Sequence, residues 1–214
     1  MRKLILKMSM SLDAFVAGAN GELDWIFKTT DAKSTAWTVD HISNAGLHIM
    51  GSKTFHDMAA FWPTSTEVFA APMNEVPKGV FTKKGFSGAD PTRVTRAVAD
   101  ALKNRAAKGE IASSAPAGAD SWAHPRVFDG DLATGIRQLK KEDGAEIIAH
   151  GGAGFAQSLV ATGLIDEFRL LVHPVAIGKG LSLFGQLTQR LNLQLAEITP
   201  FPAGTVAHIY RPAP

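Results

Sequence analysis

The residues of this chain that are best suited to chemistry form a glycine cluster behind a short apolar run. The run covers residues 146–150 and is followed by Gly151, Gly152, Ala153, Gly154 and Phe155. This order predicts a strand, a tight turn and the start of a helix. Helix N-termini present unpaired N–H groups and the positive end of the backbone dipole, and glycines let a phosphate come close to that backbone. The cluster therefore favours a phosphate site, with a plain turn as the alternative.

Two further predicted strands lead into groups of a similar kind. After residues 47–50 come Gly51, Lys53 and Thr54, and the strand at 78–82 leads into Thr82, Lys83 and Lys84. Ligands of open α/β sheets bind outside the carboxyl ends of the strands, so one dinucleotide could contact all three groups. The lysines at 83 and 84 would suit the 2′-phosphate of NADP, because point charges favour that extra dianion. A solvated turn is the alternative interpretation of these two lysines.

The composition fits one globular domain over residues 1–214. The chain has 214 residues, of which 45% are hydrophobic and 20% charged, and its net charge is +2. This balance leaves no basic footprint for nucleic acid, and no apolar run approaches the roughly 20 residues that span a bilayer. Cysteine is absent, which excludes disulfides, a thiolate nucleophile and Cys-ligated zinc. We expect a cytoplasmic protein that acts on a small molecule, without nucleic acid or membrane as a partner.

Alternating strands and helices predict an α/β fold with a mainly parallel sheet that becomes antiparallel at its C-terminal edge. Strands are expected at residues 4–11, 47–50, 78–82, 126–128, 146–150, 166–175, 191–198 and 205–211. Helices are expected at 34–46, from 51, at 93–108, at 131–141 and at 153–163. Ser34 is the expected cap of the first helix, residues 13–24 are expected to be a loop, and 191–198 a half-buried strand. Residues 86–124 are polar and suggest an irregular insertion, whose part 112–121 has little to bury and should be mobile.

Seven segments of the chain, in the right order, resemble the dihydrofolate-reductase-like superfamily. More specifically, they are similar to the reductase domain of bifunctional riboflavin-biosynthesis deaminase–reductases and their stand-alone relatives. The segments are residues 8–17 (MSMSLDAFVA), 21–25 (GELDW), 50–55 (MGSKTF), 150–155 (HGGAGF), 163–167 (GLIDE), 173–175 (HPV) and 178–184 (GKGLSLF). They cover most of the chain, and only residues 86–124 show no match.

The resemblance implies a three-layer α/β/α fold, NADPH as the hydride donor and a homodimer. It implies that Val16 and Ala17 line the nicotinamide through their backbone groups, with Trp25 closing that side. The glycine groups after residues 50 and 150 would then hold the phosphates. Thr82 and its neighbours would lie by the adenosine ribose.

The chain departs from the family pattern at three points. The family usually has Arg where Ser52 stands, and the loss of that guanidinium weakens the argument for NADP over NAD, although neighbouring lysines could compensate. Folate reductases carry an acid in the helix after the tryptophan, and the aligned position lies near Thr30, with Asp31 beside it, so folate reduction is not expected. The complete riboflavin enzymes also carry a zinc deaminase domain with a Cys-x-x-Cys signature. Because cysteine is absent, this chain is not expected to catalyse that step.

The expected reaction is hydride transfer to a C=O or C=N of a small heterocyclic or carbonyl substrate, similar to 5-amino-6-(5-phosphoribosylamino)uracil reduction. Asp24 and Asp13 are the candidate proton donors, directly or through water. A turn-capping role is the alternative for Asp13. No histidine pair has metal-ligand spacing and no Gly-x-Ser-x-Gly elbow is present, so neither a metal site nor a hydrolase is expected. Two alternatives stay open: an NADP(H)-binding protein without turnover, and a reductase of an unrelated carbonyl or pteridine compound.

Overall fold

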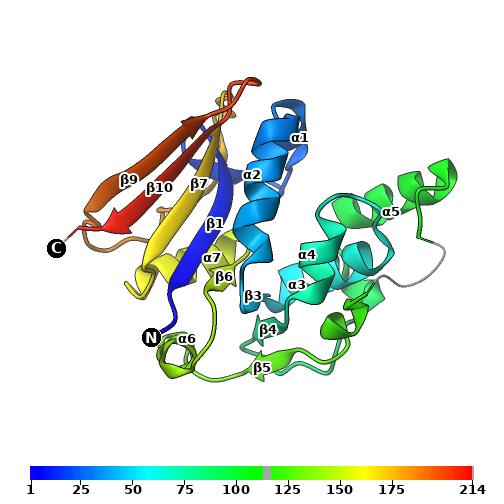
Figure 1. Cartoon of the computed structure of the whole chain (residues 1–214), viewed down its shortest axis with the longest axis horizontal. Helices are drawn as coiled ribbons and strands as arrows, with labels where there is room; N and C mark the ends of the chain where they lie inside the picture. Colours follow the sequence, from blue (N-terminus) through cyan, green and yellow to red (C-terminus); the bar gives the residue numbers. More distant parts are fainter. Residues whose placement is uncertain (113–116, 214) are drawn as a thin grey trace.

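The computed structural model describes residues 1–112 and 117–213, and its centre is an eight-stranded mixed sheet. The strand order is β5-β4-β3-β6-β1-β7-β10-β9. The strands are β1 (Leu4–Ser11), β3 (Leu47–Gly51), β4 (Lys78–Phe81), β5 (Arg126–Phe128), β6 (Ile147–Ala149), β7 (Glu167–His173), β9 (Leu193–Pro200) and β10 (Val206–Pro212). Neighbours from β5 to β7 pair parallel, whereas β10 pairs antiparallel with both β7 and β9. The predicted sheet, including its antiparallel C-terminal edge, is confirmed (Figure 1).

Helices cover both faces of this sheet and complete the three layers. They are α1 (Asp24–Lys28), α2 (Ala32–Ser43), α3 (Ser52–Phe61), α4 (Ala70–Glu75), α5 (Arg96–Lys108), α6 (Leu132–Lys141) and α7 (Ala153–Ala161). The apolar residues of α6 and α7 join one core cluster, whereas α2, α3 and α4 contribute to a second cluster with β3 and β4. Figure 1 shows α2 lying over the sheet beside β1, with α3, α4 and α5 grouped beyond it.

The first strand occupies the centre of the sheet because its side chains are apolar on nearly the whole length of one face. Leu4, Leu6 and Met8 point into the core cluster that α6 and α7 cover. Leu4 and Leu6 are fully buried, and burial of each stabilises the fold by about 1.5–3 kcal/mol. Ile5 begins the opposite face of the strand and is also fully buried. The next residue on that second face is Lys7, an unusual side chain for a central parallel strand.

The capping prediction for α2 is wrong by three residues. Asp31, not Ser34, precedes the helix: its carboxylate accepts hydrogen bonds from the backbone N–H groups of Lys33 and Ser34, and the Ser34 hydroxyl accepts one from the Asp31 N–H. This reciprocal capping box satisfies helix N–H groups that would otherwise be unpaired. Its loss costs about 0.5–2 kcal/mol in typical proteins.

Residues 13–24 are not a simple loop, as had been expected from their composition. Ala14 has a positive φ of 66° and turns the chain into β2 (Phe15–Gly18), which pairs antiparallel with β8 (Gly180–Ser182) as a separate two-stranded sheet. Short strands rich in glycine and alanine carry little periodicity, so this pairing depends on contacts that are distant in sequence.

The edge strand β9 is more exposed than its alternating leucines predict. Leu195 and Ile198 keep 48% and 56% of their surface accessible. The strand begins at Leu193 rather than at residue 191. Alternation indicates a face that could be buried, and here the described residues leave much of that face uncovered.

The described part of the predicted insertion 86–124 contains one long helix, α5, and two short 3-10 helices. Part of the segment that we expected to be mobile, residues 113–116, lies outside the described residues. Its end is anchored, because the Ser121 hydroxyl donates to the Asn74 carbonyl at 2.5 Å and the Trp122 indole donates to the Asn74 side chain at 2.8 Å. Trp122, the residue that follows this segment, is 3% exposed, whereas the described residues within 112–121 are exposed or half-buried, as expected.

In residues 1–112 and 117–213, none of the helices has both the length and the apolar surface that crossing a bilayer requires.

Candidate cofactor and substrate site

The three predicted ligand groups lie at the carboxyl ends of three adjacent strands, β6, β3 and β4. The group after β6 contacts the group after β3. A Cβ added to Gly152 in the first would overlap the hydroxyl oxygen of Thr54 in the second. A Cβ added to Gly51 would lie 3.2 Å from Cβ of Phe155. The starts of α3 and α7 are therefore side by side, as the sequence predicts for a shared ligand.

Neither of these two helix starts is closed by a side chain. The residues that precede the helices, Gly51 for α3 and Gly152 for α7, make no capping hydrogen bond through a side chain. By contrast, Asp31 caps α2 and Asp131 caps α6. The first N–H groups of α3 and α7 have no partner within their own helix, and both dipoles present their positive ends. The arrangement is suited to binding phosphate oxygens.

The turn after β4 supplies lysines at the edge of the same region. The Thr82 hydroxyl donates to the Gly85 carbonyl at 2.9 Å and accepts from the Lys84 N–H at 3.3 Å, so this side chain holds the turn. Lys83 and Lys84 are exposed, as is Lys53 at the start of α3. Their ammonium groups can reach an anion without losing an internal ion pair.

The residues predicted to surround the nicotinamide are buried around β2. Val16 and Ala17 are 3% and 7% exposed, and the pairing of β2 with β8 is irregular between Phe15 and Ala17. Trp25 is 6% exposed. Its indole N–H donates to the Glu22 carbonyl at 3.3 Å, and its ring meets that of His173 edge-on at 5.4 Å. Trp25, which belongs to α1, thus packs against His173 at the end of β7.

The two predicted proton donors are engaged elsewhere. Asp13 accepts from the Ser11 hydroxyl at 2.5 Å and from the backbone N–H groups of Ile177 and Gly178. The Ser11 hydrogen bond, helped by these N–H groups, lowers the pKa of Asp13. Asp24 faces solvent and pairs with Lys28 at 2.8 Å, which lowers its pKa too. A carboxyl group with a lowered pKa is a poor proton donor at neutral pH, so this geometry gives the predicted acid role no support.

Asp31, the acidic residue nearest the position that binds the pterin in folate reductases, is also engaged in hydrogen bonds within the protein. Besides capping α2, the Asp31 carboxylate accepts from the N–H of Ala203 at 2.7 Å, in the turn between β9 and β10. Thr30, at the aligned position, donates its hydroxyl hydrogen to the Ile26 carbonyl at 2.8 Å. Both side chains are thus engaged in hydrogen bonds within the protein.

Lys7 is a charged residue of the central strand β1 that was not among the predicted site residues. It lies on the face of β1 that α2 covers, one level beyond Ile5, and its neighbour on β7 is Arg169. Leu6 pairs with Ala149 on β6, so the next residues, Lys7 and His150, lie at one level. His150 directly precedes the glycine cluster. Desolvation lowers the pKa of Lys7 to about 8, and Lys7 is still partly accessible. The signal was present in the sequence, because a lysine amid apolar residues breaks the pattern of a buried parallel strand.

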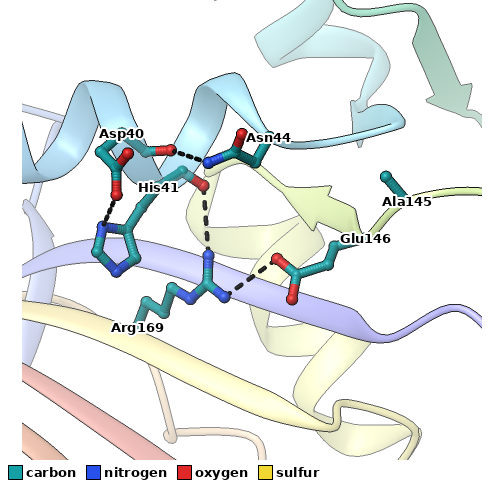
Figure 2. A pocket seen from close by; sticks show the side chains of 6 residues that line it. All are labelled: Asp40, His41, Asn44, Ala145, Glu146 and Arg169. Carbon is teal, nitrogen blue, oxygen red and sulfur yellow. Dashed lines mark hydrogen bonds and ion pairs between the residues drawn. The ribbon is translucent and has the colours of Figure 1, made fainter.

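A cavity of about 420 Å³ lies away from these loops, at the amino ends of the strands. It is lined by Asp40, His41, Asn44, Ala145, Glu146 and Arg169 (Figure 2). Arg169 is held there by the Glu146 carboxylate at 3.1 Å and by the His41 carbonyl at 3.3 Å. Its Nε also donates to the Glu167 carboxylate at 2.8 Å, so two carboxylates offset the guanidinium charge. A second pocket, of about 330 Å³, lies between residues 86–88 and 123–127.

Within residues 1–112 and 117–213, no cluster of three or more His, Asp or Glu side chains is placed to hold a metal ion.

Comparisons with known proteins place the chain in a family. The model of the RibD C-terminal domain matches residues 2–207. The uncharacterized proteins YyaP and YwjB of Bacillus subtilis are 28% and 26% identical to the chain over 210 residues, and each alignment covers 98% of this chain. The alignments cover 94% of YyaP and 98% of YwjB.

Solved structures share the fold. A putative riboflavin biosynthesis protein from a Shewanella species matches with a TM-score of 0.69 at 18% identity, covering 99% of both chains. The Thermotoga maritima diaminohydroxyphosphoribosylaminopyrimidine deaminase/5-amino-6-(5-phosphoribosylamino)uracil reductase matches with a TM-score of 0.61 at 16% identity, over 99% of this chain and 57% of that one. A pyrimidine reductase-like protein from Corynebacterium diphtheriae matches with a TM-score of 0.61 at 12% identity, over 100% of this chain and 92% of that one.

The fold is that of a dihydrofolate-reductase-like domain. The chain belongs to the family of RibD C-terminal domains. Membership of this family supports a reductase-like function.

Proposed function

We propose that this protein binds NADPH along the carboxyl edge of its sheet and reduces a small heterocyclic or carbonyl substrate. The observation that carries the proposal is the pair of uncapped helix starts, α3 and α7, which meet where Gly152 lies against Thr54. Two converging N-termini without side-chain caps are suited to a pyrophosphate. The bound dinucleotide would supply the hydride, and the protein would supply alignment, exclusion of water and the proton.

Residues along the carboxyl edge of the sheet would serve each part of the dinucleotide. The N–H groups of residues 153–155 and 52–54 would hold the pyrophosphate. Lys83 and Lys84 would contact the 2′-phosphate, and Lys53 adds a charge next to Ser52, where the family usually has Arg. The backbone of Val16 and Ala17 would line the nicotinamide.

Lys7 is the proton donor that we propose in place of Asp13 and Asp24. Its pKa of about 8 keeps the ammonium group mostly protonated at neutral pH while leaving it acidic enough to donate. Its strand neighbour His150 directly precedes Gly151, so Lys7 lies close to the cofactor edge. As hydride reaches the carbon of the substrate C=O or C=N, the electron pair of that bond would move to the heteroatom, which would take its proton from Lys7 Nζ.

Cofactor binding and turnover test this proposal in two stages. NADPH and NADH are titrated against the protein and followed by cofactor fluorescence. NADPH consumption is then measured against pteridines, aminopyrimidine ribosides and simple carbonyl compounds. Lys7→Met should lower kcat roughly 100- to 10,000-fold, as expected for loss of a general acid, with unchanged NADPH affinity. Binding without turnover of any compound would favour a nucleotide-binding protein, and absence of NADPH binding would refute the proposal.

We also propose that the protein is a homodimer formed through the exposed part of the sheet face of β9 and β10, around Leu195 and Ile198. On this face Leu195 pairs with Tyr210 and Ile198 pairs with His208. Figure 1 shows both strands at the edge of the molecule, remote from α3, α4 and α5. A two-fold contact would bring two such faces together. Ile198→Lys should convert the dimer to a monomer in light scattering, and a wild-type monomer would refute the assignment. The cytoplasmic location expected from composition stays a prediction.

A further inference from the structure

One helix of the structure is connected to both ends of the proposed cofactor site. α7 begins at the glycine cluster, where no side chain caps it. About one turn further along the same helix, the half-buried side chain of Gln157 contacts the backbone of β8. β8 pairs with β2, whose residues Val16 and Ala17 are expected to line the nicotinamide. Gln157 therefore joins two parts of the site that are far apart in the sequence.

The side-chain amide of Gln157 is engaged at both of its polar atoms. Its Nε2 donates to the Ser182 carbonyl at 2.6 Å, and its Oε1 accepts from Nε2 of Gln186 at 3.1 Å. Because a carbonyl oxygen can only accept, the contact with Ser182 decides which end of the amide is the nitrogen. The side chain thus has one orientation, and it holds β8 at a defined place beside α7.

The small sheet of β2 and β8 needs such a contact, because it is too small to fix its own position. Three residue pairs join the two strands, and their register is irregular between Phe15 and Ala17. An isolated pair of strands is at best marginally stable in water. Ser182, whose carbonyl Gln157 holds, is the partner of Phe15, directly before Val16. A displacement of β8 would therefore move the backbone that is expected to line the nicotinamide.

Other contacts hold the two ends of β8. Asp13 anchors the loop before this strand, because its carboxylate accepts from two backbone N–H groups there. Leu183, directly after the strand, is fully buried in the same core cluster as Val16. These contacts tie β8 to the end of β1 and to the core. Gln157 adds the hydrogen bond that ties it to the helix at the phosphate end of the site.

We propose that Gln157 is a positioning residue, which holds β8 and β2 beside α7 so that the phosphates and the nicotinamide of one cofactor bind at the same time. This inference rests on the proposed function for the identity of the ligand, and it extends that function to a residue outside the predicted site. Two linked groups bind more tightly than either alone only where the geometry lets both engage at once. Gln157 therefore contributes to the affinity for the nicotinamide and leaves that for the phosphates unchanged.

The test compares NADPH with 2′-phospho-ADP-ribose, which lacks the nicotinamide ring. Both compounds are titrated into the full chain by calorimetry, and the ratio of their dissociation constants measures the contribution of the nicotinamide. The wild type should bind NADPH more tightly. Gln157→Met keeps the size of the side chain and removes the donor without adding a charge. The preference for NADPH should then fall roughly tenfold, as expected when a carbonyl loses its hydrogen bond, with unchanged affinity for 2′-phospho-ADP-ribose.

Gln186→Ala is the matched control. It removes the exposed partner of Gln157 and leaves the bond to Ser182, so the preference for NADPH should stay at the wild-type value. Thermal unfolding is measured for each variant. A role in stability alone would lower the unfolding temperature of Gln157→Met without changing the preference, and this result would overturn the inference. Equal losses of affinity for both compounds would overturn it too.

Hydrogen exchange without cofactor gives a second measurement. Gln157→Met should speed the exchange of the backbone amides of residues 15–18 and 180–183, relative to the wild type and Gln186→Ala, while β1 stays protected. Unchanged exchange would show that Gln157 does not hold β8, which would overturn the inference and leave the proposed cofactor in place. A wild type that binds neither compound would instead overturn the proposed function, and with it the role of Gln157 in binding. If Gln157→Met does not fold, Gln157→Asn, which shortens the reach of the amide, replaces it in both measurements.

Discussion

Gly154 offers a substitution that should separate fold stability from cofactor binding. It is the second residue of α7, after Gly152 and Ala153, and an added Cβ would meet nothing within 4 Å. An aspartate at this position can therefore be accommodated without displacing a neighbour. Its charge would interact favourably with the helix dipole and unfavourably with a phosphate bound at the same N–H groups.

The two effects differ in sign and in size. The dipole, together with the lower helix propensity of glycine, should stabilise the fold by about 0.5–1.3 kcal/mol. That corresponds to a rise in Tm of roughly 1–5 °C for a chain of this size. A carboxylate about 6 Å from a phosphate charge would cost about 1–3 kcal/mol for effective dielectric constants of roughly 60 down to 20. NADPH affinity should therefore fall by roughly 5- to 150-fold.

Gly154→Asn is the matched control, because it has the same size without the charge. Both variants would be compared by thermal unfolding and by NADPH fluorescence titration at low and high salt. Gly154→Asp should unfold at a higher temperature than the wild type and bind NADPH more weakly than Gly154→Asn, with a difference that shrinks as salt is added. Equal affinities of the two variants at low salt would show that no phosphate lies at the start of α7, and the reasoning would fail.

Further substitutions test other parts of the structure. Lys83→Ala combined with Lys84→Ala should weaken NADPH more than NADH, and equal losses in titrations would remove the 2′-phosphate assignment. Ala14→Gly should raise the free energy of unfolding by about 0.5–1 kcal/mol in urea, because a left-handed conformation costs an alanine more than a glycine. Burial lowers the pKa of His48 to about 3 and also lowers that of His150. As pH falls below the unfolded value of about 6.5, the unfolded chain takes up protons that the folded chain refuses, so stability should drop by up to about 1.4 kcal/mol per pH unit for each histidine. Urea unfolding between neutral and mildly acidic pH, with His48→Asn expected to flatten the slope, checks this.

The order of strands and helices followed from the sequence because the central strands are short apolar runs bounded by glycines. β1 was placed at its observed residues, and the start of α6 followed from Asp131, whose carboxylate accepts from the Thr134 N–H. The juxtaposition of the strand ends also followed, since parallel strands end at one edge. These features depend on local pattern and general topology.

The features that the sequence did not predict depend on contacts between residues far apart in the chain. The pairing of β2 with β8 joins segments about 165 residues apart, and the role of Asp13 is fixed by N–H groups at positions 177 and 178. Of the two interpretations of Asp13, proton donor and turn cap, these contacts match the turn cap. Lys7 does interrupt the apolar pattern of β1, which is a signal in the sequence. Its lowered pKa arises from burial between β6 and β7, which the pattern of one strand does not reveal.

The place of β1 in the sheet has a consequence for biosynthesis. The first strand to leave the ribosome pairs on one side with β6 and on the other with β7, at residues such as 147 and 167. The backbone of its Leu-Ile-Leu run cannot form its native strand pairs on both sides until most of the chain has been synthesised. Such long-range pairing slows folding and leaves an unpaired, aggregation-prone strand accessible to other nascent chains. We expect ribosome-bound fragments that stop before residue 167 to need a chaperone, whereas fragments that extend past β7 should resist proteolysis.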